Sequence, residues 1–175
     1  MSGTGGAWLI SFRVGGAEAA LPLGIVREVT ARPLITRVPG SHPFVTGIAL
    51  HGGVALPVYD LVRLAPLWSG PRLVPADGPA GNAEHVIVCD WGEARLGLLG
   101  DRVDLLEAEW SENAPDGAQD SRCRMSAEYV SEILRRDDEA VFLLDPERLF
   151  ESLGVPAAEP PGAREDGGED DPARR

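Results

Sequence analysis

The chain has 175 residues and 43% of them are hydrophobic, enough to bury the core of one domain or of two small lobes. Its formal net charge of −12 argues against nucleic acid or an anionic membrane as a partner, because both repel an acidic surface. The apolar runs are too short to span a bilayer, and residues 1–7 lack the basic and apolar segments of a signal peptide. We therefore expect a cytoplasmic protein without direct membrane insertion.

The first part of the chain alternates short apolar runs with glycine and proline, a pattern typical of short strands joined by tight turns. Gly15-Gly16 and Gly52-Gly53 each separate two such runs, so they predict two hairpins. Residues 25–30 are compatible with a short turn or a strand. The other expected elements are strands at 8–14, 17–23, 34–38, 44–50 and 54–58, and a short helical segment at 60–68.

A second set of strands is expected after a loop rich in glycine and proline. The apolar run 85–90 is followed by a turn and by a returning run at 94–100. The remaining expected elements are a strand at 103–110, a polar loop at 111–124 and a last hairpin formed by 129–134 and 140–144.

The clearest helix signal lies at 146–153. Asp145 can accept hydrogen bonds from the free amides of the first turn, and Pro146 suits the first helical position. Gly154 can end the helix. Its predicted buried stripe consists of Leu149, Phe150 and Leu153.

These elements predict a single domain over 8–153. It would contain two lobes, roughly 8–68 and 85–145, joined by a loop at 69–84. Residues 156–175 are too polar to bury and are predicted to form a disordered acidic tail.

The sequence offers few groups for catalysis. It contains no nucleophile elbow, Walker loop or HExxH motif, and its three histidines lack a second metal-type ligand at useful spacing. The seven carboxylates in 101–120 do not match a calcium loop and are interpreted as a solvated surface. Cys89 and Cys123 are interpreted as ordinary thiols, with Cys89 buried. We therefore predict no enzyme activity, no metal and no cofactor.

Three segments carry a family resemblance: IVREVT at 25–30, FVTGIALHGGVALPVYDL at 44–61 and AVFLLDPERLF at 140–150. In this order and spacing they resemble CheW and the CheW-like regulatory domain of the chemotaxis kinase, and the similarity covers about 8–153. The matched positions are Val26, Glu28, Val29, Pro39, Gly47, Gly53, Pro57, Asp60, Leu61, Gly97, Asp101, Val103, Glu128, Tyr129 and 143–149.

The resemblance implies an all-β fold with short helices, in which two five-stranded SH3-like barrels share a hydrophobic core. It also implies a non-enzymatic adaptor that couples a methyl-accepting chemoreceptor to a CheA-type histidine kinase. Exposed aliphatic side chains rimmed by charge would provide the contacts. The candidate partner-binding residues are Val26, Glu28, Val29, Ile48, Leu50, His51, Val54 and Arg63.

Two positions leave alternative interpretations of the function open. A carboxylate at Glu28, in an apolar run, is expected to face solvent or to pair with a partner's base, because burying it alone is unfavourable. Where the family commonly has Arg-Gly, this chain has Gly52-Gly53 after His51. A divergent accessory scaffold that binds the kinase or another CheW-like domain, without receptor contact, therefore stays open. A small enzyme or ligand-binding barrel would need a deep polar pocket with converging titratable groups.

Overall fold

The structure is a computed structural model, and the residues that it describes are 7–64, 67, 83–108, 125–136 and 139–155. Most of these residues lie in strands, and the helices are short. The predicted tail at 156–175, the predicted loop at 111–124 and Cys123 lie outside the described residues.

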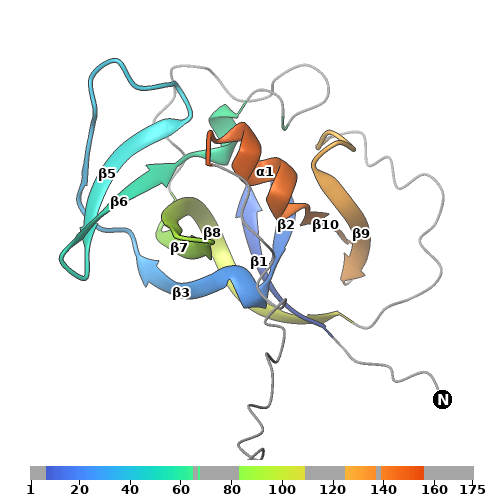
Figure 1. Ribbon diagram of the computed structural model, residues 1–175. Coiled ribbons are helices and arrows are strands. Elements are labelled where there is room, and N and C mark those ends of the chain that lie inside the picture. Colours follow the sequence, from blue (N-terminus) through green and yellow to red (C-terminus); the bar gives the residue numbers. More distant parts are fainter. Residues whose placement is uncertain (1–6, 65–66, 68–82, 109–124, 137–138, 156–175) are drawn as a thin grey trace, which may run out of the picture.

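Ten strands, short 3-10 helices and one α-helix make up the described part of the chain (Figure 1). The strands are β1 (Ala7–Val14), β2 (Ala17–Pro22), β3 (Val26–Ala31), β4 (Ile35–Thr36), β5 (Val45–His51), β6 (Val54–Tyr59), β7 (His85–Trp91), β8 (Ala94–Ala108), β9 (Val130–Arg136) and β10 (Glu139–Leu144). The helical elements are η1 (Leu23–Ile25), η2 (Leu61–Arg63) and α1 (Pro146–Ser152).

The predicted hairpins are confirmed as the antiparallel pairs β1–β2, β5–β6, β7–β8 and β9–β10. The short helical segment predicted at 60–68 is confirmed in part, since among its described residues Leu61–Arg63 form η2 and Leu67 is also in a 3-10 conformation. One other prediction was wrong. The separate strand expected at 103–110 is instead the continuation of β8, which runs without interruption to Ala108.

The strands form two lobes that interleave along the chain. Lobe A comprises β1, β2, β9, β10 and the second half of β8, whereas lobe B comprises β3 to β7 and the first half of β8. The hairpin β1–β2 belongs to the same lobe as β9 and β10, because β2 pairs in parallel with β10. The pairing thus differs from the predicted division into 8–68 and 85–145. Such long-range pairing leaves no local signal in the sequence.

One strand, β8, belongs to both lobes. Its residues 94–100 pair with β7, and its residues 101–108 pair with β1. Between the two halves, Arg102 has a positive φ of 47°, and the β1–β8 register shifts between Ser11 and Arg13. An irregularity of this kind bends a strand, and here it lies where β8 passes from lobe B to lobe A.

The open side of lobe A is closed by an ion pair. Its ladders run in the order β8-β1-β2-β10-β9, so β8 and β9 are its two ends. Arg136 on β9 reaches Asp104 on β8, with Nη2 2.7 Å from Oδ2. This hydrogen bond from Arg136 lowers the pKa of Asp104.

The largest hydrophobic core is shared by the two lobes and α1, as predicted. Residues from lobe A, lobe B and the helix meet in this cluster, including Phe12, Leu21, Ile87, Leu98, Leu144 and Phe150. Cys89 lies in the same core, and burial raises the pKa of its thiol to about 12. The predicted buried thiol is therefore confirmed.

Helix α1 packs onto this core as its sequence predicts. The Asp145 carboxylate accepts hydrogen bonds from the amides of Glu147 (3.0 Å) and Arg148 (3.3 Å), and Gly154 follows with a φ of 77°. The predicted stripe of Leu149, Phe150 and Leu153 is buried. The Phe150 ring meets Trp91 of β7 edge-on, with centroids 5.1 Å apart, so the helix also holds lobe B.

Candidate partner-binding surface

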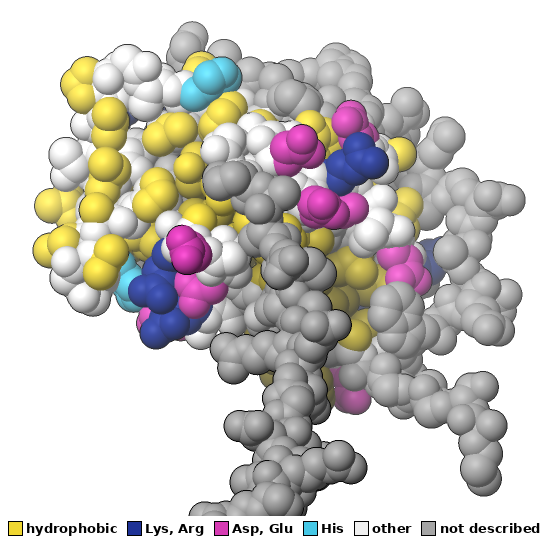
Figure 2. Space-filling model, viewed as in Figure 1, with side chains coloured by type: hydrophobic (Ala, Val, Ile, Leu, Met, Phe, Trp, Pro, Cys, Tyr) yellow, Lys and Arg dark blue, Asp and Glu magenta, His cyan; other side chains and the backbone are white. Residues whose placement is uncertain are grey.

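The β5–β6 hairpin of lobe B presents an aliphatic outer face. Alternation along β5 buries Gly47 and Ala49 and leaves Ile48 and Leu50 outside, and Leu50 is 74% exposed. Val54 at the start of β6 is 54% exposed. Figure 2 shows hydrophobic side chains gathered on the left of the view, over β5 and β6, with charged side chains beneath them. Contiguous exposed apolar groups rimmed by charge are typical of protein-binding surfaces.

The turn of this hairpin is built by two glycines. Gly52 and Gly53 have φ values of 57° and 80°, a backbone conformation that suits a two-residue turn with the twist of a hairpin. The turn pairs His51 with Val54 and so places both at the end of the aliphatic face.

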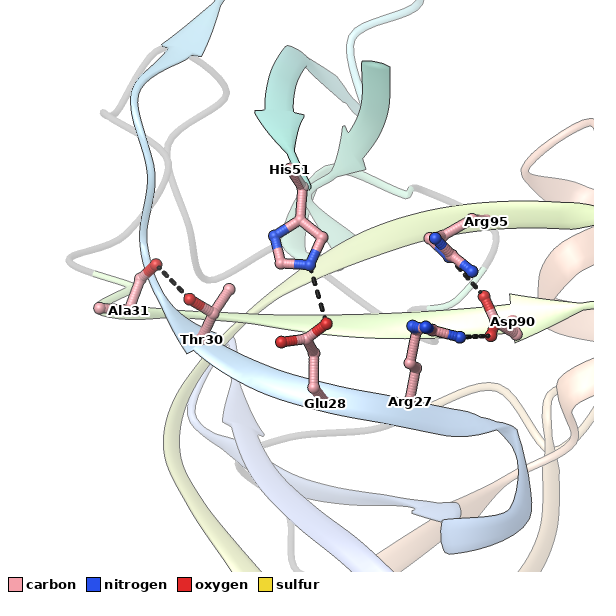
Figure 3. Close-up of polar contacts among 7 residues, drawn as sticks. All are labelled: Arg27, Glu28, Thr30, Ala31, His51, Asp90 and Arg95. Atoms are coloured by element: carbon pink, nitrogen blue, oxygen red, sulfur yellow. Dashed lines mark hydrogen bonds and ion pairs between the residues drawn. The ribbon is translucent and has the colours of Figure 1, made fainter. Parts of the chain in front are cut away.

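A bulge in β3 aims two consecutive charged side chains to the same side. The β3–β7 register shifts between Val26 and Glu28, so Arg27 is the inserted residue. Figure 3 shows the side chains of Arg27 and Glu28 on one side of the strand, whereas a regular strand would direct them to opposite faces.

These two side chains enter a charged cluster next to the aliphatic face (Figure 3). Glu28 Oε1 lies 2.8 Å from Nε2 of His51 on β5. Asp90 on β7 pairs with Arg27 at 3.1 Å and with Arg95 on β8 at 2.7 Å. The hydrogen bond from Arg95, followed by that from Arg27, lowers the pKa of Asp90. The cluster therefore ties β3, β5, β7 and β8 together at the surface.

The predicted contact residues do not all fall on this surface. Ile48, Leu50 and Val54 do, and Glu28 pairs with His51, a contact within the chain that the sequence did not predict. Val29 is exposed on β3.

The two other candidates, Val26 and Arg63, make contacts within the fold, and their assignment to partner binding stays a prediction. Val26 is half-buried and packs against the shared core. Arg63 pairs with Asp60, with Nε 3.2 Å from Oδ2, and its side chain is largely covered.

The sequence did not predict some residues of this surface, because strand pairing rather than a local sequence pattern places them. Arg27 enters the cluster through the bulge, and Asp90 and Arg95 meet only through the β7–β8 register.

A pocket of about 250 Å³ lies elsewhere, between the β1–β2 turn, η2 and β8, and includes Arg13, Asp60 and Asp101. Its charged groups are engaged by the fold. Asp60 accepts a hydrogen bond from the amide of Val62, and Asp101 accepts one from the amide of Glu84. Burial raises the pKa of Asp60. Through its hydrogen bond with the Val62 amide, Asp60 caps η2.

Within the described ranges, no three His, Cys, Asp or Glu side chains gather in a way that could hold a metal ion. The same part of the chain contains no helix with the length and apolar character needed to cross a membrane.

A family model described as the CheW-like domain matches residues 9–154 of this chain. The chain belongs to the CheW-like family. The chemotaxis protein CheW of Bacillus subtilis (strain 168) is 24% identical over 158 residues, which cover 89% of this CheW-like chain and 94% of the relative. The probable chemotaxis protein CheW of Rhizobium etli is 30% identical over 155 residues, which cover 86% and 91%.

A solved structure supports the fold of this CheW-like chain. The crystal structure of the scaffolding protein TtCheW from Thermoanaerobacter tengcongensis matches with a TM-score of 0.60 at 21% identity, covering 84% of this chain and 94% of TtCheW. The predicted all-β fold with two SH3-like lobes is thus confirmed as a CheW fold.

Proposed function

We propose that this chain is a cytoplasmic, non-enzymatic adaptor that couples a methyl-accepting chemoreceptor to a CheA-type histidine kinase. The observation that carries the proposal is the aliphatic face of β5 and β6 beside the charged cluster of β3, β7 and β8. Desolvation of such an apolar centre supplies affinity, and the charges at its rim select the partner and its orientation. Membership of the CheW-like family supports the same assignment.

The assigned contacts divide into two kinds. Ile48, Leu50 and Val54, together with Val29, supply the apolar contact. Glu28 supplies a carboxylate that is exposed enough to meet a cationic side chain of a partner. The kinase regulatory domain would dock on one lobe, while the helical tip of the receptor would bind between the lobes.

Replacement of Glu28 tests the proposal directly. We expect Glu28→Ala to weaken binding by about 2 kcal/mol or more if a partner's cation is left buried and unpaired, with the fold intact. Calorimetric titration against the CheA regulatory domain and a receptor-tip fragment measures this loss. Glu151→Ala, which removes an exposed carboxylate from α1, is the matched control.

Three outcomes are informative. A fall in thermal stability with unchanged affinity would make Glu28 a structural residue. Unchanged affinity and unchanged stability would remove Glu28 from the binding surface. If the wild-type chain binds neither partner, the adaptor assignment is wrong.

The turn at Gly52-Gly53 favours a second candidate, an accessory scaffold that binds the kinase without the receptor. Here the hairpin tip carries no side chain where the family commonly has arginine. Co-sedimentation with receptor-containing membranes separates the two candidates. Gly52→Arg sharpens the test, because a Cβ at Gly52 meets no atom within 4 Å and the left-handed backbone costs only about 1 kcal/mol. Membrane binding that appears only in this variant would favour the accessory scaffold.

A further inference from the structure

Two arginines meet on one carboxylate in the charged cluster beside the aliphatic face (Figure 3). Oδ2 of Asp90 accepts a hydrogen bond from Nη1 of Arg27, and Oδ1 accepts one from Nε of Arg95. Asp90 and Arg95 lie opposite each other in the β7–β8 register, while Arg27 comes from the bulge in β3. These three residues form a surface triad in which two positive charges share one negative charge.

The triad has hydrogen-bond donors that Asp90 does not use. A guanidinium carries five N–H groups, and the hydrogen bonds to Asp90 use one nitrogen of each arginine. The side chains of Arg27 and Arg95 are 50% and 35% exposed. Among the residues that the structure describes, Asp90 is the only acidic residue in ion-pair contact with either arginine. Because the fork of an arginine suits a carboxylate, a second acid can bind to the unused donors.

The triad is a basic site on an acidic molecule. The chain carries 28 acidic and 16 basic side chains, and its formal net charge is −12. Such a surface repels an anionic group over most of its area, whereas two neighbouring guanidinium groups attract it. Figure 2 shows basic side chains exposed below the hydrophobic side chains of β5 and β6. An acidic group of a partner is therefore attracted to this border of the aliphatic face.

The neighbourhood of the triad decides which kind of acid it would bind. The aliphatic face is exposed on the adjoining hairpin, whose His51 contacts Glu28, the residue next to Arg27. A free anion would leave the aliphatic side chains in water, whereas a protein with an acidic residue beside an apolar patch would cover them. The ligand class is thus an Asp or Glu side chain on the surface of a protein.

We propose that Arg27 and Arg95 bind an acidic side chain of the CheA regulatory domain at the border of the aliphatic face. The inference rests on the proposed function and adds the chemistry that the kinase domain must present. Asp90 holds the two guanidinium groups in place before the partner arrives, which lowers the entropy cost of binding. Glu28 lies on the same side of β3 as Arg27, so a cation of the partner would lie next to its acid. Neighbouring opposite charges favour one orientation of the partner over the reverse.

Binding kinetics of the CheA regulatory domain test the assignment. We expect Arg27→Gln and Arg95→Gln each to weaken binding about two- to five-fold in about 50 mM NaCl, mainly by slowing association. Asp90→Asn should instead speed association, because it removes the negative charge between the two arginines. These differences should shrink in about 500 mM NaCl, which screens exposed charges. Arg148→Gln, which removes a 58% exposed arginine from α1, is the matched control and should associate at the wild-type rate.

The contrary results are distinct, and thermal unfolding confirms that each variant is folded. Slower association in Asp90→Asn as well as in the two arginine variants would overturn the inference, because the triad would then not act through its positive charge. Wild-type association in both arginine variants would also overturn it, while the adaptor function would stand. A wild type that does not bind the CheA regulatory domain would refute the proposed function together with this inference.

Discussion

Each lobe has a side-chain contact between two strands that share no backbone ladder, but the two contacts differ in chemistry. Arg136 and Asp104 join β9 to β8 in lobe A, and His51 and Glu28 join β5 to β3 in lobe B. A guanidinium offers several donors in one plane, whereas an imidazole offers a single ring nitrogen to this contact. Lobe A is therefore closed by an arginine–carboxylate ion pair, and lobe B by an imidazole–carboxylate contact.

The difference matters because of what lies beside each pair. The contact between Glu28 and His51 is at the end of the hairpin that exposes Ile48, Leu50 and Val54. The side-chain contact that closes lobe B therefore lies beside the candidate partner-binding surface.

The largest effect is expected from a substitution in the hydrophobic core that both lobes share. Phe150 is fully buried and contacts Trp91 of lobe B from the helix that follows lobe A. We expect Phe150→Ala to lower the free energy of unfolding by about 3–5 kcal/mol, through lost burial and the cavity left behind. Urea unfolding measures the loss. A change below roughly 0.5 kcal/mol would place the ring at the surface, as for an ordinary exposed position.

A substitution confined to lobe B should have a smaller effect. Gly47 on β5 has a φ of 153°, and a Cβ there would collide with the carbonyl oxygen of Thr36 on β4. We expect Gly47→Ala to destabilise the protein by about 1–3 kcal/mol, because the backbone must move to relieve the contact. Amide hydrogen exchange should become faster in β4 and β5 and stay unchanged in β9 and β10. Equal acceleration in both lobes would show that the lobes do not open separately.

The smallest expected effect concerns the ion pair between Arg136 and Asp104. Asp104→Asn keeps an oxygen that can accept the hydrogen bond from the Leu105 amide but removes the charge that meets Arg136. The pKa of Asp104 is lowered in the fold, so its contribution to stability is present above the ordinary carboxylate pKa and is lost as pH falls through the lowered value.

The measurement is the thermal midpoint as a function of pH. The variant should melt slightly below the wild type, by the same amount at pH 5.5 and pH 8.0, and the difference should vanish on strong acidification. A difference that persists on strong acidification would show that the charge of Asp104 does not stabilise the fold.

The sequence predicts those parts of the fold that depend on local chemistry. Paired glycines mark the hairpin turns, and Asp145 with Pro146 marks the start of α1, because each satisfies or permits a specific backbone geometry. The division into lobes was not predictable in this way, since the pairs β1–β8 and β2–β10 join segments far apart in the chain.

The candidate partner-binding surface could also be predicted only in part from the sequence. Alternation along β5 correctly exposes Ile48 and Leu50, but exposure of aliphatic residues on β3 could not be read from spacing, and Val26 proves to pack on the core. The contact between Glu28 and His51 depends on the bulge at Arg27 and on a gap between strands, neither of which has a sequence pattern of its own. Assignment of these residues to partner binding stays a prediction.

The continuity of β8 has a mechanical consequence. The lobes cannot be pulled apart without breaking backbone hydrogen bonds to β1 on one side or to β6 and β7 on the other, because one unbroken strand carries both sets. A load applied to one lobe passes along covalent bonds into the other rather than across a deformable interface. The bend at Arg102 is the point at which a torque would concentrate. A displacement of one lobe is therefore passed to the other through the backbone of β8 as well as through the shared core.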